Sequence, residues 1–281
     1  MMLSMAGYVF NDAAMKSVLQ EVNFHQAIFI RSGIAALLML IAGWMFGAFK
    51  NGHLVVHTMR SRLVWFRTIA ELGGTWFFIT ALMNSSLVNA TAILQLLPLS
   101  VALAASVFLG EKVGWRRYLA IAIGFGGVLL IIKPGAEEFN VYSLYAVIAT
   151  LCITVREIIT RKFDDQVLSP VVSMFTAVAI CLMGLVGMQF FPLDTISKGQ
   201  AGLFCFAAVM VMVGYLCSVL AMRTGEISFV SGFRYSILIW ALVLGIVIFG
   251  DIPDIWEIVG AIIIVASGLF VSAREARQKR H

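Results

Sequence analysis

The chain has 281 residues, of which 61% are hydrophobic and only 12% are charged, and its mean hydropathy is +0.96. A soluble domain carries charge on roughly a quarter of its residues, so this composition excludes a soluble globular protein. The net charge of +5 does not indicate nucleic-acid binding, because the basic residues lie in short loops between apolar runs, where membrane proteins carry their orientation signals. The composition therefore predicts an all-α polytopic membrane protein.

Apolar runs of about 20 residues, long enough to cross a bilayer as helices, recur along the whole chain. In chain order, ten transmembrane helices are predicted at residues 2–20, 26–48, 63–82, 87–109, 114–132, 142–161, 170–191, 200–222, 227–249 and 255–273. The connections between them are short, so consecutive helices are expected to be antiparallel neighbours. Because the first run starts almost at Met1, we expect a short cytoplasmic lead to precede it.

The distribution of Lys and Arg predicts the orientation of these helices. If the N-terminus is inside, thirteen basic residues fall on the cytoplasmic side, and only Lys16, Lys133 and Lys198 fall on the other side. Cytoplasmic loops of membrane proteins carry such an excess. Both termini are therefore predicted to be cytoplasmic.

An internal repeat relates the two halves of the chain. Phe108-Leu-Gly-Glu111 matches Ile248-Phe-Gly-Asp251, and each motif ends a predicted helix and precedes a tryptophan. Five helices in each half are an odd number, so the second half must enter the membrane upside down, as in many transporters. We predict two inverted five-helix repeats at residues 1–135 and 140–273, followed by a basic cytoplasmic tail at 274–281.

Charged residues inside predicted helices are candidates for function, because each costs at least a few kcal/mol in a bilayer. Arg31, Glu71 and Arg234 lie too deep to reach the interface easily and come from three different helices. Arginine offers a bidentate fork to a carboxylate. We therefore predict that Arg31 and Arg234 bind an anionic group, and that Glu71 or Asp12 meets a cationic group or carries a coupling proton.

Other polar and aromatic residues are predicted to complete this substrate site: Asn11, Gln95, Tyr235, Arg67, Trp76 and Arg156. A structural interpretation stays open for several charges. Asp12 and Lys16 lie one turn apart on one helix, as do Arg67 and Glu71, so each pair can form within its own helix. Arg156 and the adjacent Glu157 lie near enough to the cytoplasm to extend toward water.

No motif of an enzyme, a metal site or a cofactor site is present. The sequence lacks a phosphate-binding loop, HExxH, CxxC and GxSxG. The four cysteines lie within apolar segments without CxxC spacing, which predicts free thiols packed as small hydrophobic residues. We therefore expect no enzymatic activity, no cofactor and no bound metal.

Several of these stretches resemble a known family. They are Asn11-Asp12-x3-Lys16, Ile28-Phe-Ile-Arg31, the segment from Asn89 to Pro98, Leu109-Gly-Glu-Lys-Val-Gly-Trp-Arg-Arg117 and Phe233-Arg-Tyr235. Together they are similar to the EamA-type branch of the drug/metabolite transporter superfamily. The resemblance covers the entire chain and implies ten helices, cytoplasmic termini, a bacterial inner-membrane location and a central cavity with alternating access. Within the branch, the chain looks most like bacterial S-adenosylmethionine uptake carriers, although amino-acid and riboflavin carriers share parts of the pattern.

The sequence thus predicts a secondary transporter that moves a small zwitterionic or carboxylate-bearing metabolite. Its expected partners are the substrate and the lipid bilayer, with protons or an exchanged solute for coupling; no nucleic acid is expected, and it is a monomer or a homodimer. An exporter of amino acids or metabolites from the same family is the alternative within transport. A membrane-embedded lipid-modifying enzyme and a passive channel are the alternatives from other classes.

Overall fold

The structure of the protein is a computed structural model that describes residues 1–45, 47, 52–108, 110, 114–133, 140–164, 166–224 and 233–278. In the first half, the helices are α1 (Met2–Val18), α2 (Phe24–Met45), α3 (Gly52–Arg60), α4 (Arg62–Asn84), α5 (Leu87–Leu94), α6 (Leu97–Phe108) and α7 (Trp115–Ile132). In the second half, they are α8 (Val141–Thr160), α9 (Ser169–Gly187), α10 (Lys198–Thr224), the 3-10 helix η1 (Phe233–Ser236), α12 (Ile237–Leu244), the π-helix η2 (Gly245–Phe249) and α13 (Ile255–Gln278). The prediction of an all-α polytopic membrane protein is confirmed.

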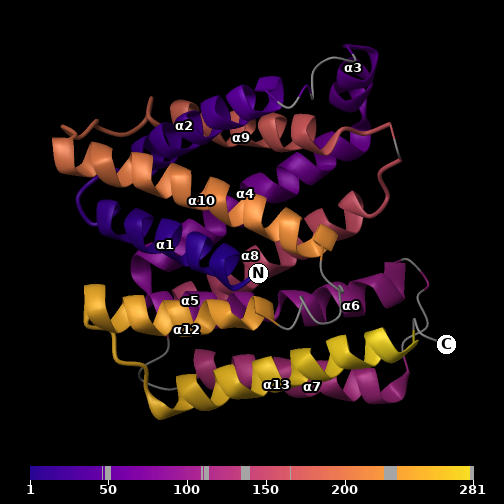
Figure 1. Cartoon of the computed structure of the whole chain (residues 1–281). Coiled ribbons are helices and arrows are strands. Elements are labelled where there is room, and N and C mark those ends of the chain that lie inside the picture. The colour runs from indigo at the N-terminus through magenta and orange to yellow at the C-terminus, as the bar shows by residue number, and fades with distance from the viewer. Residues whose placement is uncertain are drawn as a thin grey trace.

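The helices lie side by side across the molecule, and each of the four closest pairs joins one half of the chain to the other (Figure 1). The pair α2 and α9 forms one edge of the bundle, and the pair α7 and α13 forms the opposite edge. Between these edges, α4 packs against α8 and α1 packs against α10. The centre of the bundle is therefore built by both halves together.

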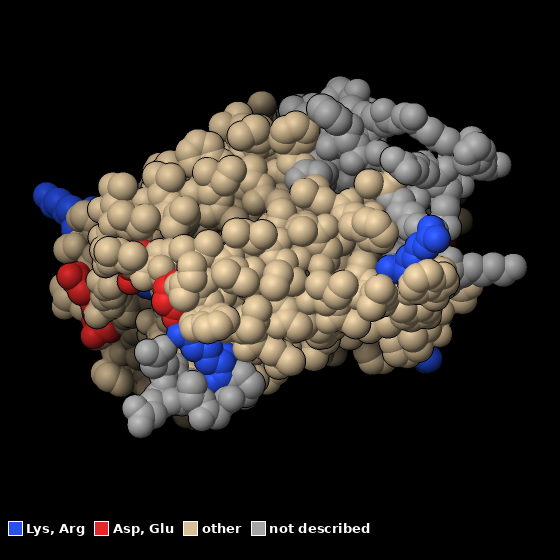
Figure 2. Space-filling model, turned by 90° about the horizontal axis from the view of Figure 1, so that it is seen from below, with Lys and Arg blue, Asp and Glu red and all other residues tan. Residues whose placement is uncertain are grey.

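The surface of the bundle is apolar over most of its width. Figure 2 shows a broad uncharged band on the face of α7 and α13, with Lys, Arg, Asp and Glu gathered at its two ends. Large apolar side chains such as Leu119, Ile123 and Ile262 are exposed on these helices. Four described segments are long and apolar enough to cross a membrane, namely Phe24–Met45, Leu87–Phe108, Val141–Thr160 and Ser169–Gly187, and shorter apolar helices cover Tyr118–Ile132, Lys198–Gly214, Phe233–Phe249 and Ile255–Val271. Ten membrane crossings remain a prediction.

The predicted helix at 87–109 is broken into α5 and α6. The break follows from Pro98, which has no N–H to donate to the carbonyl of Leu94 and whose ring crowds that carbonyl. Accordingly α5 ends at Leu94, and the next two residues form tighter bonds, Gln95 N–H to Ala92 O at 3.1 Å and Leu96 N–H to Ile93 O at 3.0 Å. Pro98 thus interrupts a membrane helix near its middle.

Two glycines of the repeated motifs have the same unusual backbone conformation. Gly110 has φ 68° and Gly250 has φ 66°, in the left-handed region that glycine adopts without steric cost. Glycine also permits close packing where α7 meets α13. A Cβ added to Gly127 would lie 2.9 Å from the carbonyl oxygen of Gly260, so these two backbones touch directly.

The structure differs from the sequence prediction in two connecting regions. The loop that follows the second predicted helix contains α3, which is anchored to the chain before α9 because Thr58 Oγ1 accepts a 3.0 Å hydrogen bond from Leu168 N–H. The helix α13 continues to Gln278, five residues beyond the predicted end, since Ala, Arg, Glu and Gln favour helix. Predicted features at Phe46, 48–51, 109, 111–113, 134–139, 225–232 and 279–281 lie outside the described residues.

Candidate substrate site

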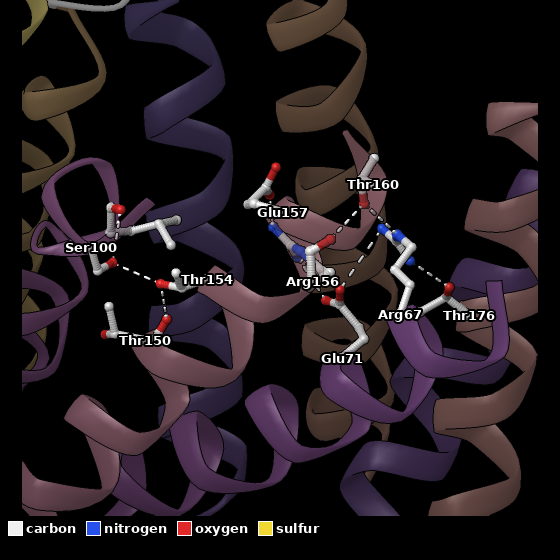
Figure 3. Close-up of polar contacts among 10 residues, drawn as sticks. Arg67, Glu71, Ser100, Thr150, Thr154, Arg156, Glu157, Thr160 and Thr176 are labelled. Atoms are coloured by element: carbon white, nitrogen blue, oxygen red, sulfur yellow. Dashed lines mark hydrogen bonds and ion pairs between the residues drawn. The ribbon is translucent and has the colours of Figure 1, made fainter. Parts of the chain in front are cut away.

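A first group of charges surrounds Glu71 on α4. Arg156 on α8 donates from Nη1 to both carboxylate oxygens of Glu71, at 3.0 and 2.8 Å, and from Nη2 to Glu157 Oε1. Figure 3 shows the Glu71 carboxylate between the guanidinium groups of Arg156 and Arg67. The exposed fractions of the Glu71 and Arg156 side chains are only 19% and 22%. Charge-assisted bonds in such a poorly solvated position are strong and fix geometry.

Arg67 completes this group from the cytoplasmic side predicted by the sequence. Its Nη2 lies 3.9 Å from Glu71 Oε2, one turn along α4. Its other nitrogens donate to hydroxyl oxygens on neighbouring helices, Nε to Thr160 Oγ1 at 3.2 Å and Nη1 to Thr176 Oγ1 at 2.8 Å. We call Arg67, Glu71, Arg156 and Glu157 the Glu71 group. It ties α4, α8 and α9 together.

A second group of polar side chains lies on α1 and α2, and Asn11 is its centre. The Asn11 carbonyl oxygen accepts a hydrogen bond from Arg31 Nη1 at 3.4 Å, and its amide nitrogen donates to Asp12 Oδ1 at 2.8 Å. Asn11 itself is buried. We call Asn11, Asp12 and Arg31 the Asn11 group. One amide side chain bridges an arginine and an aspartate of opposite charge.

The two charges of the Asn11 group have few partners. Within the described part of the chain, no ion pair of 4 Å or less joins Arg31 to Asp12, and Arg31 Nε is buried without a hydrogen-bond partner. Arg31 interacts electrostatically with Asp12 and also with Glu71. The two groups are therefore electrostatic neighbours, although their hydrogen-bond networks are separate.

Arg31 and Asp12 are enclosed by protein, yet each keeps some accessible surface. An enclosed charge without a direct counter-ion is unfavourable unless water or a solute meets it. These two side chains can therefore interact with a polar solute inside the bundle.

The other predicted site residues lie elsewhere. Trp76 forms aromatic contacts with Phe24 and Tyr145, with ring centroids 6.2 and 6.4 Å apart, so it packs between α2 and α8. Gln95 is buried at the break after α5. Tyr235 is buried in η1. None of the three is joined by a described polar contact to the Asn11 group or the Glu71 group.

Arg234 differs from its prediction in local structure. It was expected about two turns inside a regular helix, but it lies in the single 3-10 turn η1 and its side chain is exposed. No hydrogen bond or ion pair described for it connects it with Arg31. Residues 225–232, directly before this turn, lie outside the described part of the chain. The pairing of Arg31 with Arg234 in one anion site stays a prediction.

Comparison with known proteins identifies the family. Residues 1–133 match the EamA-like transporter family. The N-terminal part of the chain is therefore similar to EamA-type transporters. It is 24% identical to an S-adenosylmethionine uptake transporter of Rickettsia conorii over 100% of this chain and 94% of that protein. It is also 28% identical to a riboflavin transporter of Vibrio cholerae, over 67% of this chain and 63% of the relative. These relatives indicate that this EamA-type chain is a transporter and not an enzyme.

A solved crystal structure supports the same fold for this EamA-type chain. It is 18% identical, covers 98% of this chain and 97% of the other, and superimposes with a TM-score of 0.69. At that level of identity the likeness concerns the fold alone.

The sequence allowed two ion pairs within single helices of this EamA-type transporter. The pair of Arg67 with Glu71 is present, and the pair of Lys16 with Asp12 is not. Instead the ammonium group of Lys16 donates to the carbonyl oxygen of Ser85 at 2.6 Å and to Asp251 Oδ2 at 3.2 Å. Arg156 does not extend toward the cytoplasm, because it turns inward to Glu71. The hydroxyls of Thr160 and Thr176 had no sequence signal, since their contacts with Arg67 join helices that are distant in the chain.

Proposed function

We propose that this EamA-type transporter carries a small zwitterionic metabolite, such as S-adenosylmethionine, across the bacterial inner membrane by alternating access. In this proposal Arg31 receives the carboxylate of the substrate and Asp12 receives its cationic group. The observation that carries the proposal is the Asn11 bridge, which holds the two charges beside each other without a direct ion pair.

The distribution of partners explains why these two residues are chosen. Among the described residues, Arg31 has a single long hydrogen bond, at 3.4 Å, and an Nε without a partner, so its fork is available to a carboxylate. Asp12 accepts one described hydrogen bond, from Asn11. Glu71, the other candidate for the cationic group, already accepts two bonds from Arg156. We therefore assign binding of the substrate's cationic group to Asp12. The Glu71 group then has a structural role and holds helices in place.

The chemistry of the substrate suits this pair of charges. S-adenosylmethionine has a carboxylate, an ammonium group and a sulfonium cation, so it presents both signs of charge within one small molecule. Four S-adenosylmethionine uptake transporters of Rickettsia species are 24 or 25% identical to this chain. Their similarity supports the choice of this probe for the first experiment.

Two features of the fold support alternating access between two inverted halves. The closest helix pairs, such as α4 with α8 and α1 with α10, always take one helix from each half. The left-handed glycines Gly110 and Gly250 occupy the same position in the two matching motifs. Inverted repeats can rock against each other around a site at their interface, and the Asn11 and Glu71 groups lie close to that interface.

The orientation can be tested with reporter fusions. Fusions at Asn51, at Lys112 and after the C-terminus are expected to behave as cytoplasmic, and a fusion at Glu137 is expected not to. A cytoplasmic result at Glu137 would contradict the inverted arrangement of five helices in each half.

Transport itself is tested with the purified full chain in liposomes. Labelled S-adenosylmethionine should accumulate, and an excess of unlabelled substrate inside should accelerate its uptake, because counterflow distinguishes a carrier from a channel. Decarboxylated S-adenosylmethionine and S-adenosylhomocysteine, which lack the carboxylate and the sulfonium charge respectively, should compete more weakly. Equal competition by all three compounds would contradict a site built for both charges.

A further inference from the structure

A polar pocket opens at the end of the bundle that is predicted to face away from the cytoplasm. Its volume is about 710 Å³, within the range of small-molecule sites. Most of its lining is polar, including Lys16, Gln20, Asn84, Ser85 and Asp251. The pocket therefore has the size and polarity for a metabolite.

One ion pair in the wall of this pocket joins the two halves of the chain. Lys16, near the end of α1, lies 3.2 Å from Asp251, which follows η2. Lys16 is also held by the Ser85 carbonyl oxygen at 2.6 Å and lies over the ring of Phe249, 4.9 Å from its centroid. The Lys16 side chain is only 9% exposed, whereas Asp251 is 29% exposed. Asp251 can therefore move away from Lys16 more easily than Lys16 can leave its place.

The pocket lies close to the Asn11 group along α1. Lys16 follows Asp12 by four residues, which places it one helical turn nearer the pocket on the same face of α1. Lys16 thus forms part of the pocket wall and lies one helical turn from the proposed substrate site.

We propose that this pocket is a second, outer solute site for zwitterionic metabolites, in which Lys16 exchanges Asp251 for the carboxylate of the solute. The released Asp251 carboxylate then pairs with the cationic group of the same solute. No charge is left without a partner, because one ion pair is replaced by two. Because Lys16 keeps an anionic partner throughout, the exchange does not leave its poorly solvated ammonium group unpaired. The inference rests on the proposed function, since it assumes that a zwitterion is transported.

Cysteine labelling of the purified full chain tests the outer site. The four native cysteines, Cys152, Cys181, Cys205 and Cys217, are first replaced by serine or alanine. Gln20→Cys then reports on the pocket, because Gln20 is an exposed lining residue. Thr195→Cys is the matched control, since Thr195 is exposed on the same predicted side but outside the pocket lining. S-adenosylmethionine is the probe, and the rate of maleimide labelling is the readout.

S-adenosylmethionine at ten times its dissociation constant fills about nine-tenths of the sites, so it should slow labelling of Gln20→Cys about tenfold. It should leave labelling of Thr195→Cys unchanged. Adding Lys16→Gln should abolish the protection, and adding Asp251→Asn should weaken it. Adding Arg31→Ala should preserve it, because the outer site does not use Arg31.

Two results would overturn the outer site. One is protection that survives Lys16→Gln and disappears with Arg31→Ala, which would place the probe at the Asn11 group alone. The other is no protection of Gln20→Cys at saturating probe. Uptake by the same cysteine-free chain is measured in parallel: active uptake without protection rejects only the outer site, whereas absent uptake rejects the proposed function as well. If Lys16→Gln does not fold, Asp251→Asn alone decides the outcome.

Discussion

The two charged groups in the centre of the bundle differ in how completely their members are partnered. In the Glu71 group, the carboxylate accepts two short bonds from Arg156, and Arg67 is held by two threonines. In the Asn11 group, among the described residues, Arg31 has one long bond and Asp12 accepts a hydrogen bond from the Asn11 amide alone. A fully partnered buried charge fixes the positions of helices, whereas a partly partnered charge can still bind a solute. The comparison assigns a scaffolding role to one group and recognition to the other.

The largest expected effect comes from breaking the Glu71 group. Arg156→Met leaves the Glu71 carboxylate without its main partner and should lower the stability of the fold by about 3 kcal/mol, because the unpaired charge stays poorly solvated. The double variant Arg156→Met, Glu71→Gln should recover much of this loss. Thermal unfolding of the single and double variants in detergent is the measurement.

Glu71→Gln alone separates this scaffolding role from proton coupling. A titrating carboxylate should tolerate glutamine structurally while proton-driven accumulation disappears. A structural partner of Arg156 should instead lose stability, and the comparison of the two groups favours this second result. A stable Glu71→Gln variant without accumulation would therefore contradict the scaffolding role.

The next effect concerns recognition. Arg31→Ala should weaken S-adenosylmethionine binding by about 2 to 5 kcal/mol, which is at least roughly thirtyfold in affinity, while the fold stays intact. Arg31→Lys should restore little, because a single ammonium group does not replace the planar fork. Arg116→Ala is the matched control, since Arg116 is exposed at the start of α7. Normal uptake by Arg31→Ala would move the anion site away from α2.

A smaller effect is expected at Asn11, which bridges Arg31 and Asp12. Asn11→Leu keeps the size of the side chain but removes both hydrogen bonds to the neighbouring charges. The bond to Arg31 is long, at 3.4 Å, so the 2.8 Å bond to Asp12 should dominate. One charged bond contributes about 1.5 kcal/mol, so uptake should fall roughly tenfold. The loss should be larger for S-adenosylmethionine than for its decarboxylated analogue. An unchanged ratio between these two substrates would show that Asn11 does not position Arg31.

The smallest effect is expected at an ion pair outside the membrane-spanning segments, between Lys133 and Asp254. Partial burial opposes ionisation of Asp254, but hydrogen bonds from Lys133 and from backbone N–H groups outweigh it and lower its pKa below the ordinary 3.8. A carboxyl group whose pKa is lower in the folded than in the unfolded protein stabilises the fold at pH values above its pKa in the unfolded chain. This contribution is lost as the pH falls through the pKa of the group in the folded protein. The Tm difference between the natural chain and Asp254→Asn should therefore exist at pH 6 to 7 and disappear once the solution is acidic enough to protonate Asp254 in the folded protein. A difference that persists in acid would exclude the ion pair as its cause.

Much of the fold could be predicted because it depends on local properties of the chain. Each predicted apolar run coincides with helix in the described residues, since a segment in a bilayer must satisfy its own backbone hydrogen bonds. The break at Gln95 was foreseeable only as a kink, because Pro98 excludes a regular helix without specifying the geometry that replaces it. No pattern in the sequence predicted helix α3, because the contact that anchors it is a hydrogen bond from Leu168, 110 residues away.

The sequence by itself determined that this protein is helical, membrane-embedded and rich in internal charge, because composition and hydrophobic periodicity decide those properties without reference to distant residues. Only the tertiary structure decided which charges meet. Lys16 pairs with Asp251, 235 residues away, instead of Asp12, and Glu71 binds Arg156, 85 residues away, more closely than Arg67 on its own helix. Pairing depends on which helices of the two halves pack together and at what depth. That packing also leaves Arg31 and Asp12 beside each other without joining them.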